Sequence, residues 1–227
     1  MAQPSGEVIA VTGATGLQGG AVTRHLLEEG WRVRALTRAP GRKRARSIAA
    51  LGAEVVRADM DDPASLERAF DGVSGVFGVQ NHHISGYDGE LAQGRTVTDA
   101  ALRMGVRHVV YAAAGVGRPG TGIGSWDIKE QIIRYMRGRD LPVTILRPMA
   151  FMELMTASKF FPAASPWHVM PELMGAGRPV GWLAVDDLAV IALKVFGDRD
   201  RFVGRDLMLA ADVLSISDQN AANCGVR

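Results

Sequence analysis

Residues 8–20 have the sequence VIAVTGATGLQGG, and this stretch decides the fold. A short run rich in β-branched residues leads into glycines at positions 13, 16 and 19. An apolar helical face follows, made of Leu17, Ala21, Val22, Leu26 and Leu27. A strand, a tight turn and a helix N-terminus in this order can hold a dinucleotide pyrophosphate. Glycine lets backbone N–H groups approach the phosphates, and the helix dipole favours negative charge.

The chain continues to alternate strand and helix patterns, which argues against a mere glycine-rich surface turn. Apolar, β-rich runs lie at 8–11, 33–36, 55–56, 76–79, 109–112 and 143–146. Helical patterns separate them at 17–29, 42–51, 63–70, 89–104 and 125–137. This alternation predicts an α/β fold with a doubly wound parallel sheet, in which ligands bind beyond the carboxyl ends of the strands.

The pattern predicts two regions. Residues 1–150 are expected to form a dinucleotide-binding domain of Rossmann type, and residues 151–227 a small α/β substrate or lid subdomain. Prolines at 162, 166, 171 and 179 divide the second region, and a helix opening near Val185 has an apolar face. Residues 180–196 are therefore expected to return partly to the core. A further helix is expected to start at 214–218, although 220–227 has no apolar face to continue it.

The composition is that of a soluble globular protein. Apolar residues make up 47% of the 227 residues, and the net charge of +2 does not predict a nucleic acid or a membrane as a partner. Cys224 is the sole cysteine, so no disulfide is expected, which is typical of a reducing compartment. The chain has no apolar run of about 18 residues and does not start like a signal peptide. We therefore expect a cytoplasmic protein.

The end of the second predicted strand indicates the choice of cofactor. Sites for NAD usually place an acidic residue here to bind ribose hydroxyls, whereas a cation accommodates the 2′-phosphate of NADP. No acidic residue lies between positions 29 and 54, and Arg38 follows the strand directly. Because a guanidinium binds phosphate bidentately, we assign Arg38 to the 2′-phosphate, with Lys43 or Arg42 as a second contact. The alternative is a solvated basic helix, which we prefer for Arg44 and Arg46.

Asp59 follows the third predicted strand, and two roles are open to it. Its carboxylate is placed to accept a hydrogen bond from the adenine amino group, with Met60 packing against the ring. It is equally placed to cap the helix expected at 63–70, a role that Asp61 or Asp62 can also fill.

Lys129 is the main catalytic candidate. It lies near the start of the helix expected at 125–137, which follows a strand and a glycine-rich loop. A lysine there can bind the nicotinamide ribose and stabilise developing negative charge, and the alternative is a surface lysine. Pro148, which follows the sixth strand, is expected at the same crevice.

The histidines do not predict a metal site. His82 and His83 are adjacent, and no carboxylate or cysteine stands at ligand spacing from them. A substrate contact is the alternative for this loop. No Gly-x-Ser-x-Gly pattern or Cys/His arrangement indicates a catalytic nucleophile.

Several blocks together resemble the NmrA-like branch of the short-chain dehydrogenase/reductase superfamily, whose members are atypical. The resemblance covers residues 7 to about 210 and is specific through the order of its blocks rather than through any one of them. These blocks are VTGATGLQGG at 11–20, VRALTR at 33–38, GAEVV at 52–56 with Asp59 and Asp61-Asp62, GVF at 75–77, LRP at 146–148, FME at 151–153 and VDD at 185–187.

The resemblance implies an NAD(P)-binding Rossmann domain with a small C-terminal domain over the nicotinamide end. It also implies that Arg38 meets the 2′-phosphate and that Lys129 is the counterpart of the superfamily's active-site lysine. The residues that it places along the pyrophosphate are Thr12, Gly13, Thr15, Gly16, Leu17 and Gln18. Family members usually extend further, so the lid is expected to be either naturally short or truncated.

One departure from the superfamily bears on function. Its usual pair is Tyr-x-x-x-Lys, and here Ser125 stands four residues before Lys129. Without the tyrosine, ordinary carbonyl reduction lacks its proton donor. Some NmrA-like proteins without it are regulators that sense the nicotinamide pool, whereas others reduce quinones or enones.

The leading hypothesis is an NADPH-dependent reductase of a quinone-like or conjugated carbonyl compound. Such an acceptor delocalises charge and takes its proton from water or Ser125. An apolar or aromatic substrate would lie in a pocket shaped by Phe151, Met152 and Trp182. The alternative is a catalytically silent protein that senses NADP(H) and signals to a regulatory protein partner.

Overall fold

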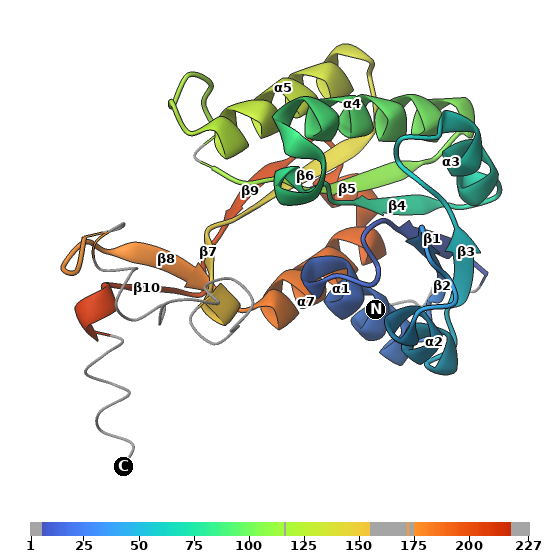
Figure 1. The fold of residues 1–227 in the computed structure, drawn as a ribbon, viewed down its shortest axis with the longest axis horizontal. Helices are drawn as coiled ribbons and strands as arrows, with labels where there is room; N and C mark the ends of the chain where they lie inside the picture. The colour runs from blue at the N-terminus through green and yellow to red at the C-terminus, as the bar shows by residue number, and fades with distance from the viewer. Residues whose placement is uncertain (1–5, 116, 155–171, 173–174, 219–227) are drawn as a thin grey trace.

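The computed structural model describes residues 6–115, 117–154, 172 and 175–218. Its main feature is a seven-stranded sheet in which every neighbouring pair is parallel (Figure 1). In spatial order the strands are β3 (Glu54–Arg57), β2 (Arg32–Thr37), β1 (Val8–Val11), β4 (Gly75–Gly78), β5 (His108–Ala112), β6 (Val143–Pro148) and β9 (Asp206–Leu209). The predicted doubly wound sheet is therefore confirmed, with the strand order reversing direction between β1 and β4.

Helices cover both faces of this sheet (Figure 1). One face packs against α3 (Pro63–Phe70), α4 (His82–Arg103) and α5 (Gly124–Gly138). The other face packs against α1 (Leu17–Glu28), α2 (Lys43–Ala50) and α7 (Val185–Gly197). In β1, Ala10 joins the first core cluster, while Ile9 and Val11 join the second. The central strands are buried on both sides, which is why their sequences are continuous apolar runs.

The chain after residue 184 returns to the main sheet. Helix α7 packs on α1, a short helix α8 (Arg199–Phe202) follows, and β9 pairs with β6. Asp206 at the start of β9 accepts hydrogen bonds from Arg147 Nε at 2.6 Å and from Arg137 at 2.9 Å. The sequence analysis did not assign β9, an edge strand of four residues in which only Leu209 is buried.

A second, smaller sheet stands beside the main one at the left of Figure 1. It consists of β7 (Ala150–Phe151), β8 (Val180–Leu183) and β10 (Asp212–Leu214), in the order β10-β8-β7. A short 3-10 helix (Met152–Leu154) follows β7, and a helical turn covers 216–218 directly after β10. The prolines at 162, 166 and 171, the tail 220–227 and Cys224 lie outside the described residues. None of the described helices is long and apolar enough to cross a membrane.

Helix α4 starts seven residues earlier than the expected 89. Asn81 caps it, because its side-chain oxygen accepts a hydrogen bond from His83 N at 2.9 Å. Gly86 then leaves the helical conformation, with φ +72° and ψ 173°. Because of this break, the first turn does not continue the helical periodicity of the rest of α4, so the sequence analysis did not detect it. His82 lies in this separate first turn.

Candidate functional site

The glycine turn has the geometry of an anion site. Gly13 has φ +59°, and Gly16 N donates a hydrogen bond to Gly13 O at 2.8 Å. A Cβ on Gly19 would lie 2.5 Å from Gly13 O, so only glycine allows α1 to pack this closely on the turn. Gly16 is the N-cap of α1, and no described side chain caps the helix. The first amides of α1 therefore have no acceptor within the helix and are available to a phosphate.

Thr12 joins the glycine turn to the end of β4. Its hydroxyl is buried, accepts a hydrogen bond from Val79 N at 2.8 Å and lies 3.3 Å from Phe77 O. The side chain thus joins two strand ends instead of facing the crevice. Gln18 has a buried Oε1 with no hydrogen-bond partner among the described residues, while Leu17 is exposed and Thr15 is half-buried.

Arg38 and Lys43 lie beside the glycine turn. Arg38 directly follows β2, which pairs with β1, and Lys43 opens α2. Both side chains are exposed, and no described residue bonds the Arg38 guanidinium. Arg44, expected to be only solvated, also donates a hydrogen bond to Thr15 O at 3.3 Å. Arg38 and Lys43 are thus exposed near the glycine turn, and Arg44 already donates a hydrogen bond to it.

Asp62 and not Asp59 caps α3. The Asp62 carboxylate accepts a hydrogen bond from Ser65 N at 3.3 Å. Asp59 instead accepts one from Asp61 N at 3.2 Å. Met60 is half-buried, with its sulfur 3.8 Å from Gln80 Nε2. The cap alternative for Asp59 is therefore wrong, and the adenine contact stays a prediction.

Lys129 is buried, so the surface-lysine alternative is wrong. Its Nζ lies 2.7 Å from Glu90 Oε1 and 3.5 Å from Gln80 O, and 5.6 Å from the centre of the Tyr111 ring. Glu90, on α4, is fully buried. Lys129 therefore points from α5 toward α4 and the carboxyl end of β4.

The sequence analysis missed Glu90. The position lies at helical spacing from Gly94, Val97 and Ala101, which all face the core. A carboxylate on an otherwise apolar helix face was the available signal. It lay close to the break at Gly86, where the periodicity is lost.

Two hydroxyl groups lie near Lys129. Ser125 is half-buried in the first turn of α5, on the same helix face as Lys129. Tyr111 is fully enclosed, and burial raises the pKa of its hydroxyl well above the ordinary value. Because it is enclosed, Tyr111 cannot stand in for the superfamily tyrosine.

The residues expected to form an apolar pocket do not all lie together. Trp182 is fully buried against Ile216, and its Nε1 donates to Leu214 O at 2.9 Å, so its predicted place in the pocket is wrong. Phe151 is half-buried and Met152 exposed. Pro148 is buried at the end of β6.

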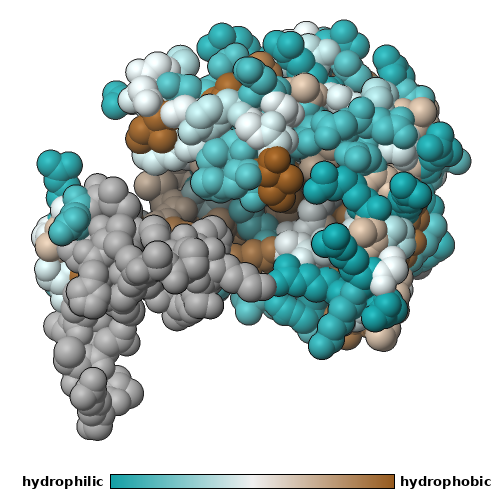
Figure 2. All heavy atoms as spheres, viewed as in Figure 1, coloured by the Kyte–Doolittle hydropathy of each residue, from teal (hydrophilic) through white to brown (hydrophobic). Residues whose placement is uncertain are grey.

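Apolar surface does occur near the start of α4 and α5. Ile84, Tyr87 and Ile123 are exposed there, in a surface that is otherwise mostly hydrophilic. Figure 2 shows hydrophobic patches above the hollow between the main body and the second sheet. The starts of both helices therefore offer an apolar surface close to Lys129.

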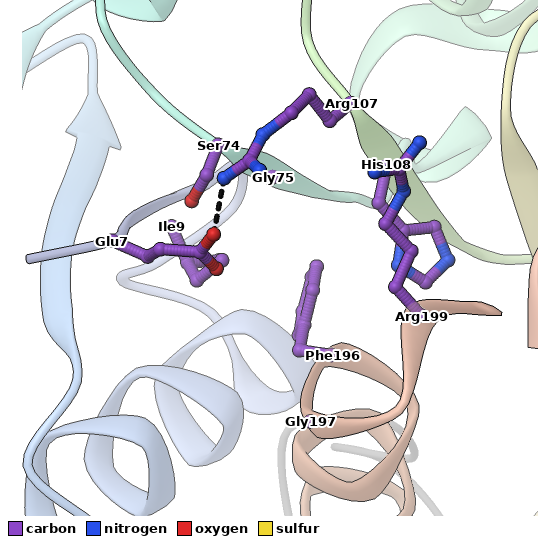
Figure 3. A pocket seen from close by; sticks show the side chains of 9 residues that line it. All are labelled: Glu7, Ile9, Ser74, Gly75, Arg107, His108, Phe196, Gly197 and Arg199. Atoms are coloured by element: carbon purple, nitrogen blue, oxygen red, sulfur yellow. Dashed lines mark hydrogen bonds and ion pairs between the residues drawn. The ribbon is translucent and has the colours of Figure 1, made fainter. Parts of the chain in front are cut away.

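A cavity of about 300 Å³ lies at the amino-terminal ends of the strands of the main sheet, opposite the glycine turn. It is formed by the starts of β1, β4 and β5 and the end of α7. Figure 3 shows the Glu7–Arg107 ion pair on one side of it, and the side chains of His108 and Arg199 on the other. His108 Nε2 lies 2.8 Å from Thr144 Oγ1. Since the glycine turn lies at the carboxyl ends of these strands, this cavity is not part of the candidate cofactor site.

The fold and the glycine turn define a Rossmann-type protein, and comparison with known proteins gives its family. The NmrA-like family model matches residues 5–221, so the chain belongs to the NmrA-like family. It is similar to the NmrA-like oxidoreductase FrzB of Cladobotryum sp, with 33% identity over 87% of this chain and 67% of that protein. It is also similar to the oxidoreductase malD of Malbranchea aurantiaca, with 30% identity over 92% of this chain and 69% of that protein.

Solved structures share the fold. NmrA, a negative transcriptional regulator, aligns with a TM-score of 0.77 at 22% identity, over 95% of this chain and 70% of its own. Triphenylmethane reductase of Citrobacter sp., in complex with NADP(H), aligns with a TM-score of 0.77 at 24% identity, over 97% and 76%. NmrA has been solved with NADP and with NAD. Relatives of this chain are thus named as oxidoreductases, and a protein that shares its fold is named as a regulator.

Proposed function

We propose that this protein binds NADPH and reduces a quinone-like or conjugated carbonyl compound. One observation carries the proposal: the glycine turn and Lys129 lie at one edge of the sheet, joined by two consecutive residues. Val79 N bonds the Thr12 hydroxyl at 2.8 Å, and Gln80 O lies 3.5 Å from Lys129 Nζ. The glycine turn and a buried cation are therefore held in fixed relation across the strand-order switch, where such folds bind dinucleotides.

The described residues fit a dinucleotide. The uncapped start of α1 supplies N–H donors for a pyrophosphate, and a Cβ on Gly16 would already lie 3.1 Å from Gly13 O. Exposed Arg38 supplies a guanidinium at the strand end where a 2′-phosphate would lie. We assign Lys43 as a second contact to that phosphate and Asp59 with Met60 to the adenine.

When bound, NADPH would supply a hydride from C4 of its nicotinamide. Lys129 would orient the nicotinamide ribose and stabilise the negative charge that develops on the acceptor. A quinone-like acceptor spreads that charge, so it does not require one positioned acid, and Ser125 or water suffices as proton source. The apolar side chains at the starts of α4 and α5 suit a flat, uncharged substrate.

A second candidate function is an NADP(H) sensor without turnover. The enclosure of Tyr111 and the serine at position 125 favour it, because the usual tyrosine position four residues before Lys129 holds a serine and the Tyr111 hydroxyl is buried away from any substrate. In that case NADPH would change the affinity for a regulatory protein partner. NmrA, which shares the fold, is named a regulator.

A screen of NADPH oxidation against quinones and enones tests the proposal, with NADPH and NADH binding measured in parallel. Turnover of at least one acceptor, at a rate proportional to protein concentration, supports the reductase. Tight NADPH binding with no turnover of any acceptor contradicts it and favours the sensor.

A further inference from the structure

Glu90 lies between Lys129 and a histidine that reaches the surface. Its Oε1 lies 2.7 Å from Lys129 Nζ, and its Oε2 lies 3.5 Å from His82 Nδ1. The Glu90 side chain is fully buried, Lys129 is 10% exposed, and His82 is 22% exposed. The three groups thus form a line from the crevice lysine to solvent.

Burial of this ion pair has a free-energy cost that fold stability does not explain. Removing two charges from water is expensive, and replacing a buried pair by apolar side chains is often neutral or stabilising. Here Glu90 lies beside an apolar face, and its second oxygen has no hydrogen bond among the described residues. Buried charge clusters in clefts are typical of functional sites. The position of the Glu90 carboxylate therefore indicates a functional role that it exerts through Lys129.

We propose that Glu90 positions Lys129 and, together with His82, carries protons from solvent to it. This proposal rests on the proposed reductase function. The superfamily tyrosine that usually donates the proton is absent here, and the proton would instead pass through three side chains. Lys129 is the catalytic group, and Glu90 and His82 act through it.

As the acceptor takes up a hydride from NADPH, the reductant, an N–H bond of the Lys129 ammonium breaks and an O–H bond forms on the acceptor. His82 takes up a proton from solvent at Nε2, and its Nδ1–H bond breaks as the Glu90 carboxylate takes that proton at Oε2. The Glu90 carboxyl group then rotates and gives the proton to the neutral Lys129 amine, so the three groups return to their starting charges. Proton exchange with solvent returns His82 to its Nδ1–H tautomer before the next cycle.

The titratable groups that face Glu90 and His82 come from α4, α5 and β5. Glu90 is faced by Lys129 of α5, by Tyr111 of β5 and by His82 of its own helix. Tyr87 stacks on His82 at 5.1 Å between ring centres, and His83 lies at 4.0 Å. Burial, His83 and Lys129 lower the pKa of His82, against the raising effect of the Glu90 charge. The pKa of His82 therefore depends on the charges of both Glu90 and Lys129.

The first test needs no cofactor and no substrate. Histidine side-chain NMR follows the titration of His82 in the apoprotein, in the wild type and in two variants. E90Q keeps the size of the side chain and removes its charge, so the His82 midpoint should fall. K129M removes the positive charge, so the midpoint should rise. Unchanged midpoints in both variants would overturn the coupling and with it the relay.

The second test uses turnover, with a histidine outside the line of three groups as the control. H82N should lower kcat on a quinone acceptor by about 10-fold while the Kd for NADPH stays within about 2-fold. H25N should leave kcat within about 2-fold, because His25 lies on α1 and contacts Glu28 and Asp186 instead of Glu90 or His82. Equal kcat in the wild type and H82N would overturn the relay and leave the reductase standing. No turnover by the wild type would overturn both.

E90Q leaves a buried lysine without its counter-charge, so its folding is checked by thermal unfolding. If E90Q does not fold, the double variant E90Q/K129M, which buries no charge, replaces it in the titration. The double variant should then give a His82 midpoint below those of both the wild type and K129M, because the raising effect of Glu90 on the pKa of His82 exceeds the lowering effect of Lys129. A midpoint equal to that of K129M would show that the Glu90 charge has no effect on His82 and would overturn the relay.

Discussion

At the scale of single residues, we expect Arg38 to determine which dinucleotide is preferred. It lies at the strand end where an acidic residue would favour NAD. We expect NADPH to bind at least about 10-fold more tightly than NADH, worth about 1.4 kcal/mol. Arg38→Ala should remove most of this preference, whereas Arg46→Ala should keep it, because Arg46 bonds Gly41 O of its own segment. Titration with both dinucleotides measures the ratio, and equal affinities in the unmutated protein would contradict the assignment.

Gly16 tests whether the turn binds phosphate. A Cβ there would lie 3.1 Å from Gly13 O, and the two methyl groups of valine would project over the start of α1. Gly16→Val should therefore abolish dinucleotide binding. Gly41→Ala is the control, since a Cβ at Gly41 meets no atom within 4 Å. Retained affinity in a folded Gly16→Val protein would mean that the loop is only a turn.

Lys129 and Ser125 separate an enzyme from a sensor. Lys129→Ala should lower kcat on a quinone while the NADPH affinity stays within about 3-fold, because the lysine acts on developing charge. Ser125→Ala should have a much smaller effect, since a quinone does not depend on one positioned acid. Loss of nicotinamide absorbance in a single turnover measures the step directly. A Ser125→Ala loss as large as that of Lys129→Ala would show that the acceptor needs this hydroxyl.

At the scale of elements, the cap of α3 separates the two roles considered for Asp59. Asp62→Ala should lower the free energy of unfolding by about 1 kcal/mol, because Ser65 N loses its acceptor. Asp62→Asn should keep most of this stability, since asparagine caps as well as aspartate. Urea unfolding measures both. An equal loss in the two variants would point to the charge of Asp62 instead of its hydrogen bond.

The elements also show how far the sequence predicts the structure. Buried strands such as β1 and β5 were predicted within a residue or two, because apolar runs on both sheet faces leave a strong pattern. Strand β9 was missed because it is a short, mostly unburied edge strand whose partner β6 is distant in the sequence, with Asp206 paired to Ile145. In the candidate site, the lysine was predicted and its partner Glu90 was not. Local sequence patterns do not show which helix packs against α5, so they could not pair Glu90 of α4 with Lys129.

At the scale of the whole molecule, stability should depend on pH through His108. Burial, with a contribution from Arg199, lowers the pKa of His108 from 6.5 to about 4. The folded state thus resists protonation of a group that protonates readily when unfolded, so stability is full above about pH 6.5 and is lost as the pH falls toward 4. The loss is on the order of 3 kcal/mol.

His108→Gln should flatten the pH dependence in this window, because glutamine can still donate a hydrogen bond toward Thr144 but does not titrate. His83→Asn is the control, since His83 is exposed. The free energy of unfolding is measured by urea at several pH values between 4 and 7. A slope that is unchanged in His108→Gln would assign the pH dependence to other groups.

The return of α7 and β9 to the main sheet has a consequence for the order in which the protein is made. Helix α1 and its glycine turn leave the ribosome before α7, which covers α1 and is synthesised more than 150 residues later. The apolar side of α1, including Val22 and Leu26, lacks the cover of α7 until that helix has been made. The nascent chain must therefore carry an exposed apolar surface until residue 197 has emerged, and the cofactor site can become rigid only after that moment.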